Sequence, residues 1–309
     1  MTEIAISARG LTRYFGKTPV VNQIDFALPK GTVSGLIGLN GAGKTTTLRM
    51  LMGLLSPTRG RCEVLGVESR EWTPQHRCRI GYTVEGHFLY SWMKVRESET
   101  LQRRTFDRWN GILFQQTIAR FGISPDQFCG RLSRGQRAGV SLALTLSAEP
   151  DILILDDPAL GLDPISRRAL NATILEFVAD GTRTVLLSTH MLDDVERVAD
   201  RILLMIDGRI LVDATMESFR SRTCVWTVEL DQTTIAPNTI PGLVHAYSIG
   251  NRWQFTVVDS DQETESALSR LGGGNLQKHD GSFDESVIAY LSRTRHNGSF
   301  LNTQSAGVS

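Results

Sequence analysis

The order of apolar and polar residues divides the chain into segments with different periodicities. Residues 4–9 and 20–28 alternate apolar with polar positions, which predicts antiparallel strands with one buried face. Other segments are short and almost wholly apolar, the pattern of strands buried on both faces of a parallel sheet. These predicted buried strands are residues 31–37, 79–85, 151–156 and 185–190, with a shorter strand at 63–66.

Helical spacing appears in three places before residue 200. A helix is predicted to open at residues 46–52, and the apolar run 140–146 predicts a buried helix. Residues 95–121 space their apolar side chains loosely at helical intervals among many charges, which predicts an amphipathic helical region. After these helices, Asp207-Gly208 is a strong turn dipeptide, so residues 201–206 and 209–212 are predicted to form a hairpin.

The pattern changes character near residues 219–223, where we predict a domain boundary. Beyond it, strands are predicted at 224–231, 243–249 and 252–258, and helices at 262–271 and 283–291. Ser282 to Glu285 has the spacing of a capping box, which supports the last helix. We therefore assign residues 1–220 to a main domain, 221–294 to a small α+β domain, and 295–309 to a polar, disordered tail.

Composition and charge argue against several classes of protein. Lys plus Arg and Asp plus Glu are both 33, so the net charge is zero and no nucleic-acid partner is expected. The chain starts without the basic and apolar pattern of a signal peptide, and no run of about 18 apolar residues predicts a membrane span. The four cysteines are scattered, so we expect reduced thiols and no cysteine metal site.

One nine-residue stretch gives the strongest indication of function. It fits the phosphate-loop pattern G-x-x-x-x-G-K-[ST] between a predicted strand and a predicted helix. Its glycines let backbone N–H groups approach phosphate oxygens, while Lys44 is suited to the β and γ phosphates and Thr45 to Mg²⁺. A tight structural turn would not need the Lys-Thr pair. The predicted nucleoside triphosphate site comprises Gly38, Leu39, Asn40, Gly41, Ala42, Gly43, Lys44, Thr45 and Thr46.

Acidic residues follow the predicted buried strands. Asp156 and Asp157 close one of them, and ligands of open α/β sheets bind at this end of the strands. Asp156 is suited to Mg²⁺, and Asp157 to orienting an attacking water. Glu85 and His190 end two further strands. A solvated loop acid and a satisfied core histidine are the ordinary explanations of Glu85 and His190 taken alone.

Two other features allow two interpretations each. Ser133 and Gly135 stand at the start of a predicted helix, where a phosphate could bind, but N-capping explains the serine equally well. Tyr14 and Phe15 precede a turn, where one of the rings could stack on a base or simply end a strand.

Taken together, the ordered motifs resemble those of the nucleotide-binding subunits of ABC transporters over residues 3–220. The phosphate loop matches Walker A, residues 152–157 match Walker B, and residues 159–163, with Asp163, resemble the D-loop. His190 falls at the switch histidine, and Phe15 at the adenine-stacking aromatic, with Tyr14 as second choice. The segment similar to the LSGGQ signature is Leu132, Ser133, Arg134, Gly135 and Gln136.

The resemblance implies both a fold and a mode of action. The fold would be an α/β P-loop NTPase of the ABC ATPase type, with an antiparallel β subdomain and a helical subdomain at about residues 90–150. The small C-terminal α+β extension looks like that of ATPases paired with ABC-2 type export permeases. The resemblance further implies a head-to-tail pair of cassettes, Mg²⁺ with ATP, and a separate integral-membrane permease. The chain would then be cytoplasmic and peripheral on the inner face of the membrane.

Four positions depart from the family pattern. Glu85 stands where a glutamine is usual, which adds negative charge near the γ-phosphate and should raise the dependence on metal. Asp157 replaces the usual catalytic glutamate, so slow hydrolysis is expected. Arg134 replaces a signature glycine, and Gly139 stands where an arginine is common. With Thr45 and Asp156, Glu85 completes the predicted metal-facing set.

Three functions therefore compete. The leading one is an ATPase subunit that powers export through a permease. The second is a regulatory subunit that binds ATP and dimerises but hardly hydrolyses it, which the substitutions Asp157 and Glu85 favour. The third is an ABC ATPase that acts on ribosomes or DNA, against which the zero net charge counts. The transported substance is expected to be selected by the permease.

Overall fold

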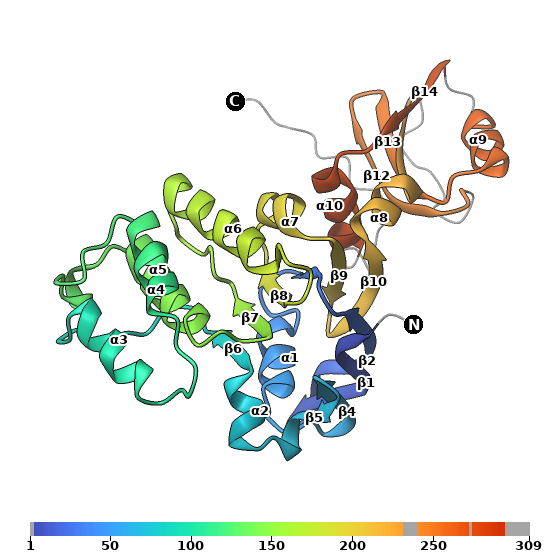
Figure 1. The fold of residues 1–309 in the computed structure, drawn as a ribbon. Coiled ribbons are helices and arrows are strands. Elements are labelled where there is room, and N and C mark those ends of the chain that lie inside the picture. Colours follow the sequence, from blue (N-terminus) through green and yellow to red (C-terminus); the bar gives the residue numbers. More distant parts are fainter. Residues whose placement is uncertain (1–2, 231–239, 272–273, 294–309) are drawn as a thin grey trace. The chain divides into compact units, whose positions relative to one another are not determined.

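The computed structural model describes residues 3–230, 240–271 and 274–293. The chain forms two compact units, Met1–Asp213 and Ala214–Ser309 (Figure 1). Each unit is built on its own sheet or sheets, and each is described by itself below. The tail predicted at 295–309 lies outside the described residues.

A six-stranded sheet of order β10-β9-β3-β8-β7-β6 is the centre of the first unit. Neighbouring strands from β9 to β6 run parallel, and every residue of β3, β7 and β8 is buried, as the apolar runs predicted. β9 and β10 form the predicted hairpin around Asp207 and Gly208, both with positive φ. The strands are β3 Val33–Ile37, β6 Ile80–Thr83, β7 Ile152–Asp156, β8 Thr184–Thr189, β9 Arg201–Ile206 and β10 Arg209–Thr215.

An antiparallel sheet of order β2-β1-β4-β5 covers one side of this centre. Helix α1 (Lys44–Leu51) lies between the two sheets, and one apolar core joins all three. The strands are β1 Ile4–Phe15, β2 Thr18–Pro29, β4 Arg59–Val64 and β5 Val67–Glu68. The strand predicted at 63–66 therefore begins earlier and ends at Val64, because Leu65 and Gly66 adopt positive φ and turn the chain into β5.

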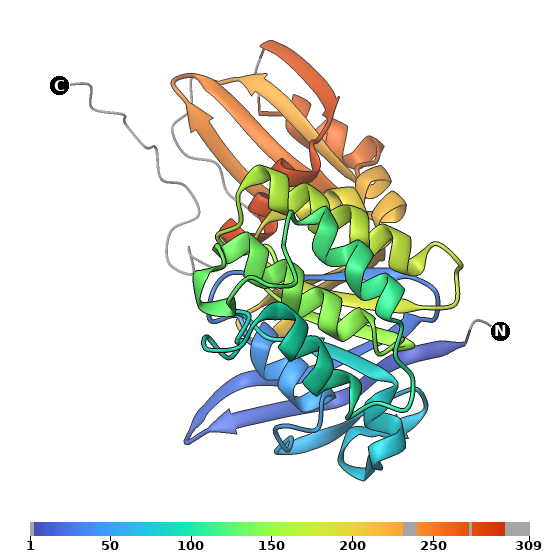
Figure 2. The same cartoon turned by 60° about the vertical axis from the view of Figure 1, so that its left-hand side comes forward.

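Helices occupy the remaining sides of the first unit. The amphipathic region 95–121 is two helices, α3 and α4, which pack with α5 around a separate apolar cluster (Figure 2). α6 contacts β8, and α7 contacts β3. The helices are α2 Pro74–Cys78, α3 Val95–Arg103, α4 Gly111–Arg120, α5 Arg134–Leu146, α6 Pro164–Val178 and α7 Leu192–Val198, with 3-10 turns at Ser69–Glu71 and Cys129–Arg131.

The second unit is a four-stranded antiparallel sheet of order β12-β13-β11-β14, with helices beside it. The core on one face holds Trp226, Trp253, Phe255 and Leu268 of α9. Its elements are α8 Met216–Arg222, β11 Thr223–Glu229, β12 Leu243–Ile249, β13 Arg252–Val258, α9 Gln262–Ser269, β14 Gly274–Asp280 and α10 Phe283–Arg293. Within the described ranges, none of the helices has the length and apolar character that crossing a bilayer requires.

Candidate functional site

The glycine-rich loop joins the end of β3 to the start of α1, as the sequence predicted. Gly43 has φ +108, and a Cβ added there would lie 2.6 Å from the Val20 carbonyl oxygen. A larger residue would therefore push the loop away from β2. Lys44 is buried, and its Nζ donates hydrogen bonds to the carbonyls of Gly38 (2.8 Å) and Leu39 (3.3 Å). The first turn of α1 holds no acidic residue, so its positive end is free to favour an anion.

Asp156 connects three elements at the carboxyl edge of the sheet. Its Oδ1 accepts hydrogen bonds from Thr45 Oγ1 (3.1 Å) and from Ser188 Oγ (2.6 Å). The parallel register of β7 and β8 pairs Asp156 with Ser188, which places their side chains together. Carboxylate and hydroxyl oxygens are the donors that Mg²⁺ prefers, so Thr45 and Asp156 have the chemistry to hold this ion.

Asp157 and His190 form a second contact at the same edge. His190 Nδ1 lies 3.0 Å from Asp157 Oδ1, and because the carboxylate accepts, Nδ1 carries the hydrogen. The backbone N–H of Asp157 donates to the Ser188 carbonyl at 3.0 Å. Asp157 has φ +45, a left-handed conformation that is uncommon outside glycine and is often found at functional sites.

The negative charges of three predicted acids act on Lys44. Burial lowers the pKa of Lys44, while the negative charges of Asp157, Asp156 and Glu85 oppose that shift. Glu85 follows β6 and is exposed, so it is close enough to influence Lys44 but is not sealed in the site. The charges of all three predicted acids thus act on Lys44.

The two aromatic candidates end β1. Phe15 is 49% exposed, and the Arg13 guanidinium lies over its ring, 4.9 Å from the centroid. Tyr14 is half-buried, and its N–H donates to Thr58 Oγ1 at 3.1 Å. Phe15 is therefore the more accessible ring, and its stacking on a base stays a prediction.

Ser133 is the N-cap of α5. Its Oγ accepts from the Gln136 N–H (3.2 Å), and Gln136 Oε1 accepts from the Ser133 N–H (3.1 Å), which completes a capping box. Gly135 packs closely against α6, because a Cβ added there would lie 2.6 Å from Ser166 Cβ. The ordinary interpretation of Ser133 as a cap is thus correct, and the exposed side chain remains available for a second contact.

Asp163 also caps a helix. Its carboxylate accepts from the N–H groups of Ile165 and Ser166, both at 3.0 Å, and from Ser166 Oγ at 2.6 Å. The Ser166 hydroxyl is the main cause that lowers the pKa of Asp163. The segment therefore has a structural explanation at the start of α6, and a contact of Asp163 with a partner's ATP stays a prediction.

Two departures from the family pattern, Arg134 in the signature segment and Gly139 after it, have packing explanations. The Arg134 side chain lies against Gly161, whose added Cβ would come within 2.9 Å of Arg134 Cζ. A Cβ added at Gly139 would lie 2.8 Å from Phe121 Cβ, so the Phe121 side chain fills the space that a larger residue would need. Both positions fit the fold as it stands.

Sequence reasoning missed three residues at or beside the site: Ser188, Arg13 and His87. Ser188 could have been found, because it lies two residues before His190 in a strand that ends beside Asp156. His87 is 5% exposed, and its Nε2 lies 3.2 Å from the Pro158 carbonyl oxygen. Burial is the main cause that lowers the pKa of His87. The charge of Arg134 lowers it further, whereas the hydrogen bond to the Pro158 carbonyl raises it.

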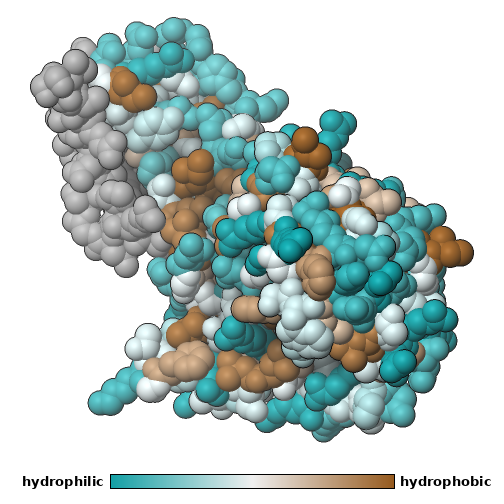
Figure 3. Space-filling model, turned by 90° about the vertical axis from the view of Figure 1, so that its left-hand side faces the viewer, coloured by the Kyte–Doolittle hydropathy of each residue, from teal (hydrophilic) through white to brown (hydrophobic). Residues whose placement is uncertain are grey.

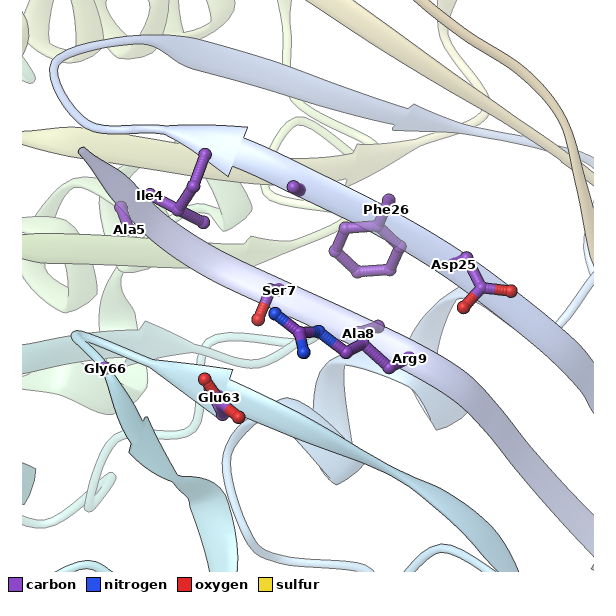
Figure 4. A pocket seen from close by; sticks show the side chains of 10 residues that line it. Ile4, Ala5, Ser7, Ala8, Arg9, Asp25, Phe26, Glu63 and Gly66 are labelled. Atoms are coloured by element: carbon purple, nitrogen blue, oxygen red, sulfur yellow. The ribbon is translucent and has the colours of Figure 1, made fainter. Parts of the chain in front are cut away.

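A separate hollow of about 450 Å³ lies on the antiparallel sheet (Figure 4). Arg9, Asp25 and Glu63 reach it from three strands, and Asp25 Oδ1 accepts from the Gly10 N–H at 2.8 Å. None of the residues that the sequence singled out lines it. We therefore place the functional site at the phosphate loop. In the described part of the chain, no three His, Cys, Asp or Glu residues cluster as a metal site, and the cysteines are free.

The fold and this site together define an α/β protein of the phosphate-loop nucleotide-binding class. A family model described as ABC transporter matches residues 21–160. The chain is 34% identical over 219 residues to the fluoroquinolones export ATP-binding protein MT2762 of Mycobacterium tuberculosis (strain CDC 1551 / Oshkosh), covering 68% of this chain and 70% of that protein. It is 33% identical over 227 residues to the probable multidrug ABC transporter ATP-binding protein YbhF of Escherichia coli (strain K12).

That second match covers 72% of this chain and 39% of YbhF, so the chain spans well under half of that relative. A solved structure of an ATP binding subunit of an ABC transporter superposes with a TM-score of 0.63 at 27% identity, covering 70% of this chain and 92% of the other. The chain belongs to the ABC transporter family and has the fold of its ATP-binding subunits. The resemblance found in the motifs and the predicted fold class are both confirmed.

Proposed function

We propose that this chain is an ATP-hydrolysing subunit that powers transport, in the export direction, through a separate membrane permease. The observation that carries the proposal is the gathering of Lys44, Thr45 and Asp156 at the carboxyl edge of the parallel sheet. Phosphoryl transfer is catalysed mainly by positioning and charge neutralisation, and these groups supply both. The export direction is supported by the name of a related protein, the fluoroquinolones export ATP-binding protein MT2762.

In this proposal each residue has a defined task. The loop N–H groups and Lys44 bind the phosphates of ATP, and Phe15 stacks on the base. Thr45 and Asp156 hold Mg²⁺, which supplies positive charge to the phosphates when bound. Glu85, exposed beside this set, is a further oxygen donor for the ion or its water. Asp157 orients the attacking water, and His190 fixes the Asp157 carboxylate through its Nδ1–H.

The length of the Asp157 side chain limits the rate. Aspartate is one methylene shorter than glutamate, and a displacement of about 1 Å costs on the order of 100-fold in rate. The bond from His190 already holds the Asp157 carboxylate at one position, so it does not move freely toward a distant water. We therefore propose slow hydrolysis by the isolated chain.

A second cassette completes the site in this proposal. Ser133 is exposed at the positive end of α5, beside the backbone of Gly135, and this arrangement suits a phosphate. By the resemblance to ABC ATP-binding subunits, each ATP would sit between the phosphate loop of one chain and the signature segment of the other. ATP would then close the pair and hydrolysis would open it, with Asp163 at the contact.

The loop between β6 and α3 is the proposed contact with the permease. Phe88 is 84% exposed, Trp92 70% and Tyr90 61%, and the Tyr90 and Trp92 rings lie 5.9 Å apart. A hollow of about 250 Å³, lined by Phe88, Tyr90 and Leu101 among others, opens beside them. Clustered exposed aromatics mark interaction sites. Figure 3 views the side of the first unit that carries α3–α5, where hydrophobic residues are exposed among hydrophilic ones. Docking there would hold the chain at the inner face of the membrane.

A second candidate is a subunit that binds ATP and dimerises but hardly hydrolyses it. Asp157 in place of glutamate and the charge of Glu85 favour it, whereas the intact contacts of Lys44 and His190 favour hydrolysis. The two candidates differ in one measurable quantity, the turnover of the chain by itself.

The deciding experiment measures Mg-ATP turnover of the purified chain while light scattering follows dimerisation. Lys44→Ala should abolish turnover, and Lys30→Ala, which removes an exposed lysine paired with Glu3, is the matched control. Asp157→Glu should raise turnover by about 10-fold or more, because it restores the reach of the carboxylate. Ordinary turnover that Asp157→Glu barely improves would refute slow hydrolysis. Dimerisation without turnover, restored by Asp157→Glu, would favour the second candidate.

A further inference from the structure

His87 is a buried histidine in the loop 84–94, where most side chains are exposed and Met93 is the other buried residue. It lies two residues after Glu85 and directly before Phe88, which is 84% exposed, yet His87 itself is only 5% exposed. Its φ is +47, a left-handed conformation that a residue with a Cβ adopts at a cost of about 1 kcal/mol or more. The loop therefore turns its backbone at His87, which brings this ring inward.

The His87 ring contacts the segment that follows β7. His87 Nε2 lies 3.2 Å from the Pro158 carbonyl oxygen, and since a carbonyl only accepts, Nε2 is the donor. The other ring nitrogen, Nδ1, is buried and has no hydrogen-bond partner among the described residues. Pro158 is the residue directly after Asp157, so this one bond joins the loop of Glu85 to the chain that carries Asp157.

The same turn receives another contact. The Arg134 side chain at the start of α5 lies against Gly161, three residues after Pro158. The turn itself is closed by backbone bonds from Leu160 N–H to the Asp157 carbonyl (3.2 Å) and from Leu162 N–H to the Ala159 carbonyl (3.1 Å). Residues 158–161 thus form a closed turn against which the loop 84–94 and helix α5 are both fixed.

We propose that His87 is a positioning residue that holds the loop 84–94 against the turn after Asp157 and thereby fixes Asp157 relative to Glu85. The kinetic consequence of this proposal rests on the proposed hydrolytic function, whereas the contact of His87 with Pro158 does not. Because the bond reaches Pro158 and not the phosphate loop, its loss should reduce the rate of hydrolysis and leave the binding of ATP intact.

The test compares two substitutions at this position. His87→Gln keeps a side-chain N–H donor, whereas His87→Leu keeps a similar volume without a donor. We expect His87→Leu to lower kcat by about 10-fold or more, because small displacements of catalytic groups are costly. The dissociation constant for ATP should change by less than about twofold, and His87→Gln should recover most of the lost rate. His76→Leu, at a half-buried histidine on α2 that has no part in the site, is the control.

Hydrogen exchange of the full chain provides a readout that does not depend on turnover. His87→Leu should speed amide exchange in residues 86–93 and 158–162, and His87→Gln should not. If the wild-type chain hydrolyses no ATP, the proposed function fails, and the exchange measurement still decides whether His87 anchors the loop. Unchanged exchange in both segments would overturn the proposal. So would a His87→Leu variant with wild-type kcat, or a His87→Gln variant as slow as His87→Leu. If His87→Leu does not fold, His87→Asn replaces it, because asparagine tolerates the left-handed backbone but is too short to span to Pro158.

Discussion

The two units use their sheets in opposite ways. In the first unit, β7 and β8 run parallel and end together, so that Asp156 and Ser188 meet at one edge. In the second unit, β11 lies antiparallel to both of its neighbours, so successive strands end at opposite edges. A parallel sheet collects the polar ends of its strands in one place, whereas an antiparallel sheet separates them.

The buried residues of the two sheets differ accordingly. β7 and β8 contribute aliphatic side chains in their middle, and their polar residues are Thr184 at the start of β8 and Asp156, Ser188 and Thr189 at the carboxyl ends. The sheet of the second unit buries Trp253 and Phe255, whose rings stack with centroids 6.0 Å apart. This contrast indicates that the functional groups lie at the edge of the first sheet, and that the side chains in the middle of the second sheet serve packing.

The largest expected effect is on the stability of the second unit. Phe255 is fully buried, so Phe255→Ala should cost the second unit about 3–5 kcal/mol of unfolding free energy. ATP affinity of the first unit should change by less than about twofold, since substitutions without shared partners act independently. Denaturation followed by tryptophan fluorescence, together with ATP titration, measures both. Tyr247→Ala, at a 39% exposed ring on the same sheet, is the control. A parallel loss of ATP affinity would show that the two units are energetically coupled.

The second prediction compares substitutions at the two ends of β7. Asp156→Asn removes the carboxylate that meets Thr45 and Ser188, and should lower turnover by about 100- to 1,000-fold, the size found for a preorganised charge-stabilising group. Asp151→Asn, at the opposite end of β7, breaks only an exposed ion pair with Arg79 and should change turnover little. Steady-state kinetics over a range of Mg²⁺ concentrations compares them. Equal losses at both ends would contradict the assignment of function to the carboxyl edge.

Much of the first unit could be predicted because its signals are local. The apolar runs located the strands, and the glycine-rich loop located the start of α1, since only a few residue types fit a turn that packs against β2. The carboxylates at strand ends were also predictable, because parallel topology alone brings them together. These features require no knowledge of distant contacts.

Other features were not predictable from local pattern. α6 has no counterpart among the predicted elements, although its buried residues recur at helical spacing. β14 has few strand-forming residues and is defined by its pairing with β11. The contact of His87 with Pro158 joins residues 71 positions apart, so no periodicity could reveal it.

The smallest expected effect concerns a buried carboxylate that lies on a helix instead of at a strand end. Asp194 on α7 is 2% exposed and accepts from Asn171 Nδ2 at 3.1 Å, with Arg167 Nε 3.9 Å from the same oxygen. Burial raises the pKa of Asp194 above its usual 3.8, more than these two partners lower it. The folded protein therefore holds this proton more tightly than the unfolded chain does.

The sign of the pH dependence follows from linkage. The stability that the protonated Asp194 contributes is fully present below pH 3.8 and is lost as the pH rises through the raised pKa. In Asp194→Asn the group no longer titrates, so the unfolding free energy of wild type minus variant should fall as the pH rises from about 4 toward neutrality. Urea denaturation at several pH values measures this difference, and Asp193→Asn removes one charge from an exposed position of the same helix as a control. A difference that instead grows with pH would mean that Asp194 is stabilised as the anion by Arg167, and that this buried acid resembles those at the sheet edge.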